Sequence, residues 1–311
     1  RLYYSSLPSA VATPIITWDT NVATGTWIDI NPSDGENITG LKRTKSTLLV
    51  FKHNHIYKVF SVNETEPDPK INVGTYSQES IVEAKDGVYF HHPTGIFRYS
   101  DGDASEISRP VIDFIKNITL ANYTKVAGWA DEDHCYWSVG NVTVGDTTFS
   151  NVVLRYTIST KRWTVYTYPT QFLMSSRYND GSSLFYLAGD SSGSVFKMNT
   201  GNTDNGTAIS YSLIHAWDNL DGFTGTKKTV SQIMFTHIGG TGANISYQTE
   251  GDRENDWLKS IGQLGDRNTF FTNADVSGRK VKFRIAGSSS GEPLEYTGYE
   301  IFNANAQIET N

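Results

Sequence analysis

A hairpin pattern recurs four times in the first two thirds of the chain, and this repetition constrains the fold more than any other feature. Each copy has an apolar strand, a polar loop and a second strand in which a basic residue follows an aromatic residue or leucine. The copies occupy residues 48–60, 87–100, 135–159 and 184–200. Their basic residues recur at intervals of roughly 40 residues, with one longer interval. These residues are Lys58, Arg98, Arg155 and Lys197.

A further short strand pattern precedes each copy, at residues 38–42, 80–84, 125–130 and 172–177. Three or four strands repeated about every 40 residues are typical of a β-propeller blade. A lone four-stranded sheet cannot cover both of its faces, whereas blades packed around an axis can. We therefore predict an all-β protein with a β-propeller over residues 1–203, containing four clear blades and a partial one.

The partial blade is predicted from the opening residues, "RLYYSSL". This stretch resembles the second or third strand of a blade whose beginning is absent. It contains no initiator methionine, so we expect the N-terminus to be processed or trimmed.

The longer interval is explained by two insertions. Residues 108–118 predict a short helix, with Ser108 as its cap, Pro110 in its first turn and an apolar face that includes Phe114 and Ile115. Residues 140–150 predict an enlarged hairpin loop.

The period ends near residue 203. The polar segment 199–207 suits a linker. Five later strand patterns alternate between apolar and polar residues, as at Ile233 and Phe235, which indicates sheets with one buried face. We predict a smaller antiparallel β-sandwich-like domain at residues 204–311.

Composition narrows the classes of partner. The formal net charge is -7, and the basic runs are short, so we expect no direct nucleic-acid binding. No apolar run approaches the roughly 20 residues that a membrane span needs. Cys135 is the single cysteine, lies in an apolar strand pattern and is expected to be buried and unreactive.

Histidines at two hairpin tips are candidate metal ligands. His53 and His55 fall in the first turn, and His91 and His92 fall at the corresponding place in the second. Four imidazoles from adjacent turns could bind Zn²⁺ or Ni²⁺. The favoured interpretation is ordinary turn residues, because Asn54 suits a tight turn and the other two hairpins have no histidine there. We predict no resident metal or cofactor.

Acidic residues offer two further candidates. Glu83 and Asp29 lie in strand patterns of different repeats, where a propeller glycosidase would place its paired carboxylates. No recognisable catalytic motif accompanies them, and we predict no catalytic residue. Two turns carry alternating acids that could hold Ca²⁺, but capping of the turns is the commoner role. These acids are Asp101, Asp103, Asp131 and Asp133.

Four tryptophans near strand ends could stack on sugars, namely Trp129, Trp137, Trp163 and Trp217. Most tryptophans in sheet proteins lie in the core, and we expect that here. The residues that would bind a glycan are not indicated by the sequence.

In order along the chain, several strand and turn motifs resemble those of propeller-bearing virion proteins of tailed bacteriophages, found in the tail or neck. The matching positions are Arg1 to Ser5, Pro8, Trp18, Asp34-Gly35, Ile38 to Leu41, Leu48 to Lys52, Ile56-Tyr57, Ser80 to Glu83, Gly87 to Phe90 and Ser108 to Ile112. The C-terminal residues 280–302 are similar to the terminal sandwich strands of such proteins. These motifs are structural, and the absence of an earlier blade departs from the pattern.

The resemblance implies a non-enzymatic structural component of a bacteriophage particle. Its partners would be other virion proteins, with a homo-oligomer inside the particle, and it would assemble in the bacterial cytoplasm and reside in the virion. A glycan-binding host-recognition module is the alternative, and a propeller glycoside hydrolase is the third hypothesis.

Overall fold

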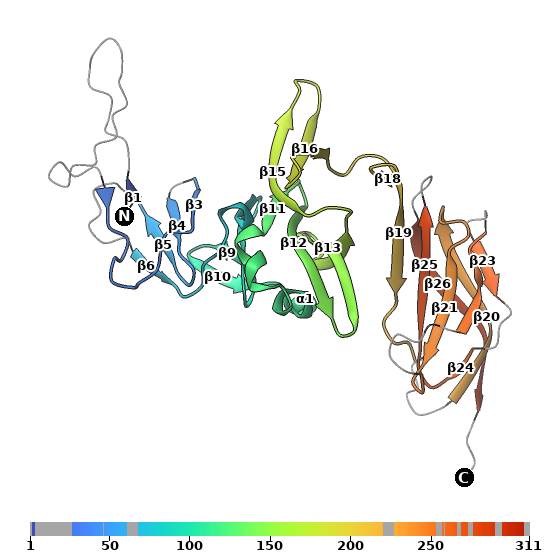
Figure 1. Ribbon diagram of the computed structural model, residues 1–311. Helices are drawn as coiled ribbons and strands as arrows, with labels where there is room; N and C mark the ends of the chain where they lie inside the picture. Colours follow the sequence, from blue (N-terminus) through green and yellow to red (C-terminus); the bar gives the residue numbers. More distant parts are fainter. Residues whose placement is uncertain are drawn as a thin grey trace. The chain divides into compact units, whose positions relative to one another are not determined.

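The computed structural model describes residues 2–3, 27–45, 47–60, 68–219, 227–252, 257, 259–265, 269–272, 276–289 and 294–307. Within these residues the protein is all-β. Antiparallel sheets follow one another along the chain, with short helical turns between them (Figure 1). The chain divides into two compact units, Arg1–Asn199 and Thr200–Asn311, which we call unit 1 and unit 2. The predicted boundary, after residue 203, lies four residues further along the chain.

Unit 1 contains three antiparallel sheets of four strands, and in each sheet every strand pairs with the next one along the chain. The first sheet consists of β3 (Gly40–Arg43), β4 (Leu48–Phe51), β5 (Ile56–Val59) and β6 (Asp68–Ile71). The second consists of β7 (Val82–Ala84), β8 (Gly87–His92), β9 (Gly95–Ser100) and β10 (Asp103–Glu106). The third consists of β11 (Ala127–Ala130), β12 (His134–Val144), β13 (Thr147–Thr157) and β14 (Arg162–Thr167). The predicted hairpins and the short strands before them are confirmed in these sheets.

The other strands of unit 1 form two smaller sheets. A fourth sheet has three strands, β15 (Phe172–Asn179), β16 (Leu184–Asp190) and β17 (Val195–Lys197). The opening strand β1 (Leu2–Tyr3) pairs with β2 (Trp27–Ile28). Residues 4–26 lie outside the described residues, and with them most of the predicted partial blade.

Consecutive sheets of unit 1 share their hydrophobic cores. Leu49 and Phe51 of the first sheet pack in one cluster with Phe90 of the second. The second and third sheets share a cluster that contains Tyr89 and Trp137, and the third and fourth share one that contains Trp129, Tyr136, Phe172 and Ala188. Middle strands such as β4 and β8 are therefore buried on both faces, which explains why they read as continuous apolar runs.

The predicted helix is present but short. A 3-10 turn at Arg109–Val111 leads into α1 (Ile112–Lys116), and Ile115 is fully buried in the core. Ser108 does not cap it, so that prediction is wrong. The Ser108 hydroxyl instead accepts a 2.9 Å hydrogen bond from the Ile96 amide and donates one of 3.1 Å to Glu106. It therefore anchors β9 rather than the helix end.

Two hairpin predictions need correction. His91 and His92 lie in strand β8, opposite Ile96 and Gly95, and not in the turn. Residues 140–150 are not an enlarged loop: β12 and β13 continue past a bulge near Gly140 to a short turn that contains Gly145, whose φ is +57°. Alternating threonines and valines support the longer strands, since β-branched residues favour extended backbone.

Unit 2 contains two antiparallel sheets. The five-stranded sheet has the order β18 (Thr203–Asp204), β19 (Thr207–Ile214), β25 (Val281–Ser289), β21 (Asn244–Thr249) and β22 (Lys259–Gln263). In the other sheet, β20 (Lys227–Ile238) pairs with β23 (Thr269–Thr272), β24 (Val276–Gly278) and β26 (Glu295–Gln307). Phe235 from β20 packs with Ile245, Phe283 and Ile285 from the five-stranded sheet, so the two sheets enclose one core.

The predicted linker contains a tight hairpin. Asn205 and Gly206, with φ of 48° and 84°, join β18 to β19. Two successive positive φ values suit a two-residue hairpin turn, which the Asn-Gly pair supplies. Among the described residues, no helix has the length and hydrophobicity required to cross a bilayer.

Candidate functional site

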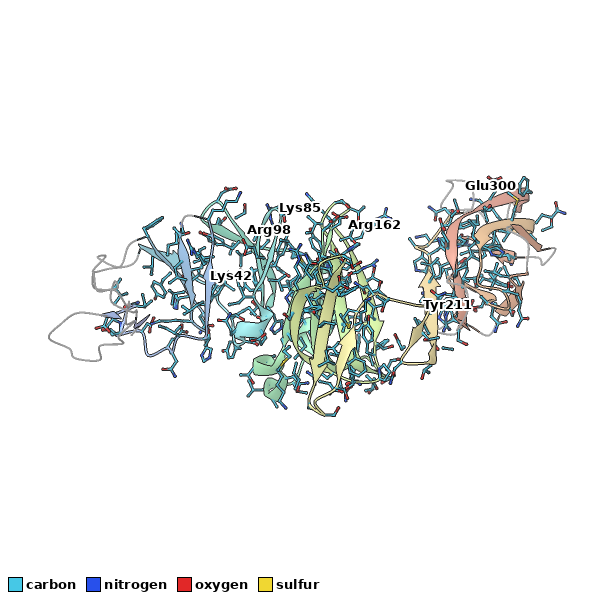
Figure 2. All side chains as sticks on the ribbon, turned by 90° about the horizontal axis from the view of Figure 1, so that it is seen from above. Lys42, Lys85, Arg98, Arg162, Tyr211 and Glu300 are labelled. Carbon is cyan, nitrogen blue, oxygen red and sulfur yellow. The ribbon has the colours of Figure 1, made fainter. Side chains whose placement is uncertain are left out.

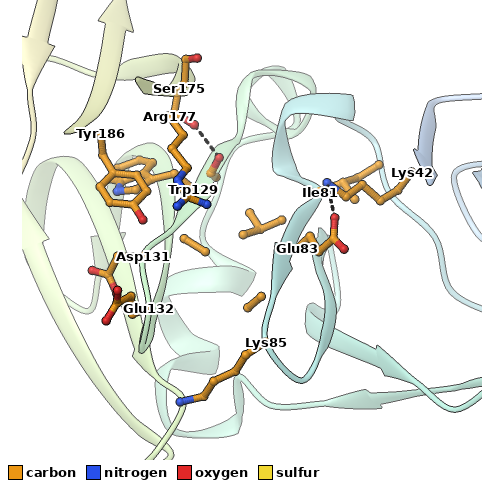
Figure 3. Close-up of a pocket in the computed structure, with 15 residues that line it drawn as sticks. Lys42, Ile81, Glu83, Lys85, Trp129, Asp131, Glu132, Ser175, Arg177 and Tyr186 are labelled. Atoms are coloured by element: carbon orange, nitrogen blue, oxygen red, sulfur yellow. Dashed lines mark hydrogen bonds and ion pairs between the residues drawn. The ribbon is translucent and has the colours of Figure 1, made fainter. Parts of the chain in front are cut away.

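The strongest candidate site is an open groove in unit 1 with a volume of about 490 Å³ (Figure 3). It is bordered by the first strand of each of the four sheets, β3, β7, β11 and β15, which we call the first strands. The lining residues are Lys42, Ile81, Val82, Glu83, Ala84, Lys85, Gly128, Trp129, Ala130, Asp131, Glu132, Ser175, Ser176, Arg177 and Tyr186. Four repeats therefore contribute corresponding strands to one concavity.

Specific contacts hold the first strands together. The Ser175 hydroxyl of β15 donates a 2.8 Å hydrogen bond to the Gly128 carbonyl of β11. A β-carbon at Gly128 would lie 2.5 Å from Cγ2 of Val82 on β7, so glycine is needed for the close approach of these strands. On β3, the Leu41 amide donates to Gln78 Oε1 at 2.6 Å, and Gln78 Nε2 donates back to the Leu41 carbonyl.

The charges that line the groove are largely paired. Lys42 Nζ on β3 lies 3.1 Å from Glu83 Oε2 on β7 (Figure 3), and Lys85 Nζ lies 2.9 Å from Asp133 Oδ1. Figure 2 labels both lysines. Both pairs are partly exposed, so solvent screens them and each contributes little to stability. Their main effect is to link neighbouring sheets across the groove.

Asp131 is held as an ionised acceptor. Burial opposes ionisation, but hydrogen bonds from the backbone of Asp133, from the Tyr136 hydroxyl and from His134 outweigh it and lower the pKa of Asp131. Asp131 thus caps the turn between β11 and β12, as the capping interpretation of the acidic turns predicts. Asp133 accepts a hydrogen bond from the Ser159 amide, which is also a capping role.

The two carboxylates considered for hydrolysis do not meet in the groove. Glu83 lines it and pairs with Lys42. Asp29 follows β2 and is absent from the lining. The other carboxylates that line the groove are those of Asp131 and Glu132, in the turn after β11.

The two histidine-bearing hairpins do approach each other. Asn54 Oδ1 lies 3.3 Å from His92 Nε2. The His53 ring stacks on Tyr76 with centroids 4.2 Å apart, and Tyr76 also contacts the His92 ring. His91 is fully buried, and neither of its ring nitrogens has a hydrogen-bond partner among the described residues. Tyr76 thus contacts both His53 and His92, and among the described residues the four imidazoles do not form a group of ligand atoms within 4.8 Å of one another.

His55 belongs to a different group. Within the part of the chain that the structure describes, one group of three ligand-type side chains has its ligand atoms within 4.8 Å of one another: Asp34, Glu36 and His55. The Lys52 ammonium already donates to both Asp34 oxygens, at 2.7 and 2.6 Å, and is 2% exposed. A divalent cation would have to displace this lysine, so the group is a buried ion pair that closes the loop before β3.

An acid–tyrosine contact recurs between repeats, and the sequence analysis missed it. The Tyr89 hydroxyl donates to Asp86 at 2.8 Å, and the Tyr136 hydroxyl donates to Asp131 at 2.8 Å. In both sheets the acid lies in the turn after the first strand and the tyrosine lies on the second strand. In two repeats an aspartate precedes a strand tyrosine by three or five residues, and this pattern could have predicted the contact.

The tryptophans divide between core and surface. Trp137 is fully buried, Trp129 is 5% exposed and stacks on Tyr136, and Trp163 donates to the Ile107 carbonyl at 2.9 Å. Trp217 in unit 2 is 46% exposed. The expectation of core positions is thus correct for Trp129 and Trp137 and wrong for Trp217. Cys135 is fully buried, as predicted.

Similarities to this chain come from solved structures rather than from family models or curated proteins. No protein-family model matches the sequence. No curated protein matches it either. The computationally designed Ika4 protein aligns over 56% of this chain and 97% of its own, with 11% identity and a TM-score of 0.34.

Two further solved structures align with lower TM-scores. An exo-β-1,3-galactanase from Phanerochaete chrysosporium with galactose covers 86% of this chain and 69% of its own, at 9% identity and a TM-score of 0.19. A Bacillus thuringiensis Cry1Da tryptic core variant covers 89% and 51%, at 11% identity and a TM-score of 0.17. These TM-scores carry no argument about function.

Proposed function

We propose that unit 1 has a β-propeller architecture and that the protein is a non-enzymatic structural component of a bacteriophage tail or neck. The observation that carries the architectural part is the common groove of the first strands. Successive four-stranded sheets that share cores and turn their first strands to one concavity are what a propeller requires. The role in a phage particle rests on the resemblance of the strand and turn motifs to tail and neck proteins.

The state of the groove carboxylates favours a binding or scaffolding role over hydrolysis. A glycosidase needs one carboxylic acid that stays protonated and one free carboxylate on either side of the scissile bond. Glu83 is paired with Lys42, and the pKa of Asp131 is lowered by the hydrogen bonds of its turn despite burial. Neither is placed to act as the general acid.

Exposed apolar side chains on the fourth sheet offer a contact surface for other virion proteins or further copies of this chain. Met174 and Tyr178 on β15 are 59% and 52% exposed, and Val195 on β17 is 68% exposed. This sheet has three strands where the preceding three have four. Large exposed apolar groups near an open sheet edge favour protein–protein association.

The test is the presence of the chain in purified particles. Phage particles from the lysate of the bacterium whose phage encodes this chain are banded on a density gradient and analysed by mass spectrometry. A gold-labelled antibody against unit 2 then locates the chain by electron microscopy, with an antibody against the major capsid protein as the control. We expect several copies per particle and label at the tail or neck. A chain that is absent from washed particles contradicts the proposal.

The hydrolase hypothesis has a separate test. The purified chain is incubated with a panel of β- and α-linked oligosaccharides, and released reducing ends are measured. We expect no release above that of a Glu83→Gln variant. Release that the variant abolishes contradicts a non-enzymatic role.

A further inference from the structure

Two tryptophans and two cations gather on the five-stranded sheet of unit 2. The Lys282 ammonium lies 4.9 Å from the centre of the Trp217 ring and 5.2 Å from that of Trp257. The Arg284 guanidinium lies 5.8 Å from the Trp257 ring. A cation held over two indoles is restrained in position, because the negative faces of both rings attract it.

Strand alternation places this group on the face away from the core. Val281, Phe283 and Ile285 of β25 are fully buried in the core of unit 2, so Lys282 and Arg284 between them point to the opposite side. The segment that carries Trp217 runs beside β25: the Asp218 amide donates to the Val281 carbonyl at 2.7 Å, and the Val281 amide donates back at 2.9 Å. The backbone therefore fixes where Trp217 lies relative to Lys282.

The two cations have no carboxylate partner among the described residues. The Arg284 Nε group donates to the Ser212 hydroxyl at 3.0 Å, which leaves its terminal nitrogens for another acceptor. Lys259 of the same unit differs: it also lies over a ring, Tyr247, but donates to both oxygens of Asp252 at 2.7 and 2.8 Å. Lys282 and Arg284 are thus positive groups that are held in place by neutral side chains.

We propose that this surface binds an acidic saccharide, a sugar that carries a carboxylate. The carboxylate would accept hydrogen bonds from Lys282 and Arg284, and an apolar face of the sugar ring would pack on Trp217, which is 46% exposed. This site is independent of the proposed role in the particle, because it lies wholly within unit 2.

The charge balance favours a sugar over single-stranded nucleic acid, which also stacks on aromatic side chains. Binding along a phosphate backbone requires a basic groove that spans several nucleotides. Among the described residues this surface offers two cations, Lys282 and Arg284, on a chain with a formal net charge of -7. A single carboxylate has two oxygens, so it can accept a hydrogen bond from each of these two cations.

The test uses the full chain on a glycan array that presents sialylated, uronic-acid-containing, sugar-phosphate and neutral glycans. We expect saturable binding to at least one carboxylate-bearing glycan and weaker binding to its neutral counterpart. Titration calorimetry with the bound glycan should then show affinity at least about tenfold weaker in Trp217→Ala and in Lys282→Gln. Thermal melting of each variant verifies that the fold is retained.

Lys259→Gln is the matched control. Like Lys282, Lys259 lies over an aromatic ring, but its ammonium group already has a carboxylate partner, Asp252. We expect its affinity for the glycan to equal that of the unmodified chain. The inference is overturned if no carboxylate-bearing glycan binds better than the neutral ones, or if both variants bind as the unmodified chain does. Binding of only sugar phosphates, or of a single-stranded oligonucleotide through these residues, also overturns it. None of these results bears on whether the chain is present in particles.

Discussion

The Ser175 hydroxyl donates a 2.8 Å hydrogen bond to the carbonyl of Gly128, and this bond joins the first strand of the fourth sheet to that of the third. The two residues are far apart in sequence and lie in different sheets. Similar long-range links tie Leu41 to Gln78 and Trp137 to the Ser80 carbonyl. One of these bonds joins two first strands directly, and the other two tie β3 and β12 to the 3-10 turn at Gln78–Ser80, while neighbouring sheets share apolar cores.

Replacing Gly128 with alanine should destabilise unit 1. The new β-carbon would lie 2.5 Å from Val82 Cγ2 and 3.1 Å from Trp137 Cδ1, which forces β7 and β11 apart. We expect a loss of about 1–3 kcal/mol in the free energy of unfolding, measured by urea denaturation. Gly298→Ala is the control, because no atom lies within 4 Å of its new β-carbon. Equal stabilities for the two variants would contradict the close approach of the strands.

Replacing Lys52 with methionine should lower the free energy of unfolding more than breaking an exposed ion pair does. The change leaves the Asp34 carboxylate, which is 10% exposed, without its cation. Removing one partner of a buried pair typically costs about 3–5 kcal/mol. Lys85→Met removes the partner of Asp133 in a pair whose side chains are 56% and 33% exposed, and should lower the stability much less because solvent screens this pair. Similar losses for both variants, measured by chemical denaturation, would show that Lys52 is not buried as described.

The free energy of unfolding should depend on pH in the weakly acidic range, because His91 becomes protonated there only in the unfolded chain. Burial, with a smaller contribution from the charge of His92, lowers the pKa of His91 from 6.5 to about 3. As the pH falls below 6.5 the unfolded chain binds a proton that the folded chain does not. The protein is therefore most stable with respect to His91 above pH 6.5, and its free energy of unfolding decreases progressively as the pH falls from 6.5 toward 3.

The expected slope is about 1.4 kcal/mol per pH unit for this one proton. Urea denaturation between pH 6.5 and 4.5 measures it, and His91→Leu should reduce the slope by that amount. His92 and His215 also have pKa values lowered by burial and add slopes of the same sign, which the variant retains. An unchanged slope in His91→Leu would mean that the imidazole is not buried as described.

Cys135 should not react with thiol reagents in the native protein. Its side chain is fully buried, and burial, with the nearby charges of Asp86 and Asp131, raises the pKa of the thiol. Because the thiolate is the reactive form, modification should require unfolding. A chromogenic disulfide reagent should modify one thiol per chain in denaturant and almost none in buffer. Rapid modification in buffer would contradict the packing of β12.

Local patterns in the sequence predicted most strands. A strand buried on one face alternates apolar and polar residues, as at Ile233 and Phe235. A strand buried on both faces has a continuous apolar run, as at residues 48–51. Both patterns can be recognised in the sequence without knowledge of distant contacts. Turn geometry was harder to predict. His91 and His92 were predicted to lie in a turn because they correspond to His53 and His55, but the pairing of His91 with Ile96 and of His92 with Gly95 places both in β8. Ser108 has the chemistry of a helix cap, yet the amide of Ile96 competes for its oxygen.

The groove and the unit 2 surface are formed by residues that are far apart in the sequence, so local sequence patterns could not predict them. Glu83 was identified as a strand carboxylate, but its pairing with Lys42 depends on how the first two sheets pack. Trp217 was named as an aromatic residue that could stack on sugars, whereas Lys282, its neighbour in space, is 65 positions later along the chain. Packing between two sheets decides the first contact, and the bridge between Asp218 and Val281 decides the second.

The central claim is that the first strands of unit 1 surround one axis in a virion protein. The most direct measurement is an electron cryomicroscopy reconstruction of the phage particle at a resolution that separates strands. We predict density for this chain in the tail or neck, with β3, β7, β11 and β15 innermost and facing a common axis. Density in which these four strands face away from one another, or a particle without the chain, would contradict the account.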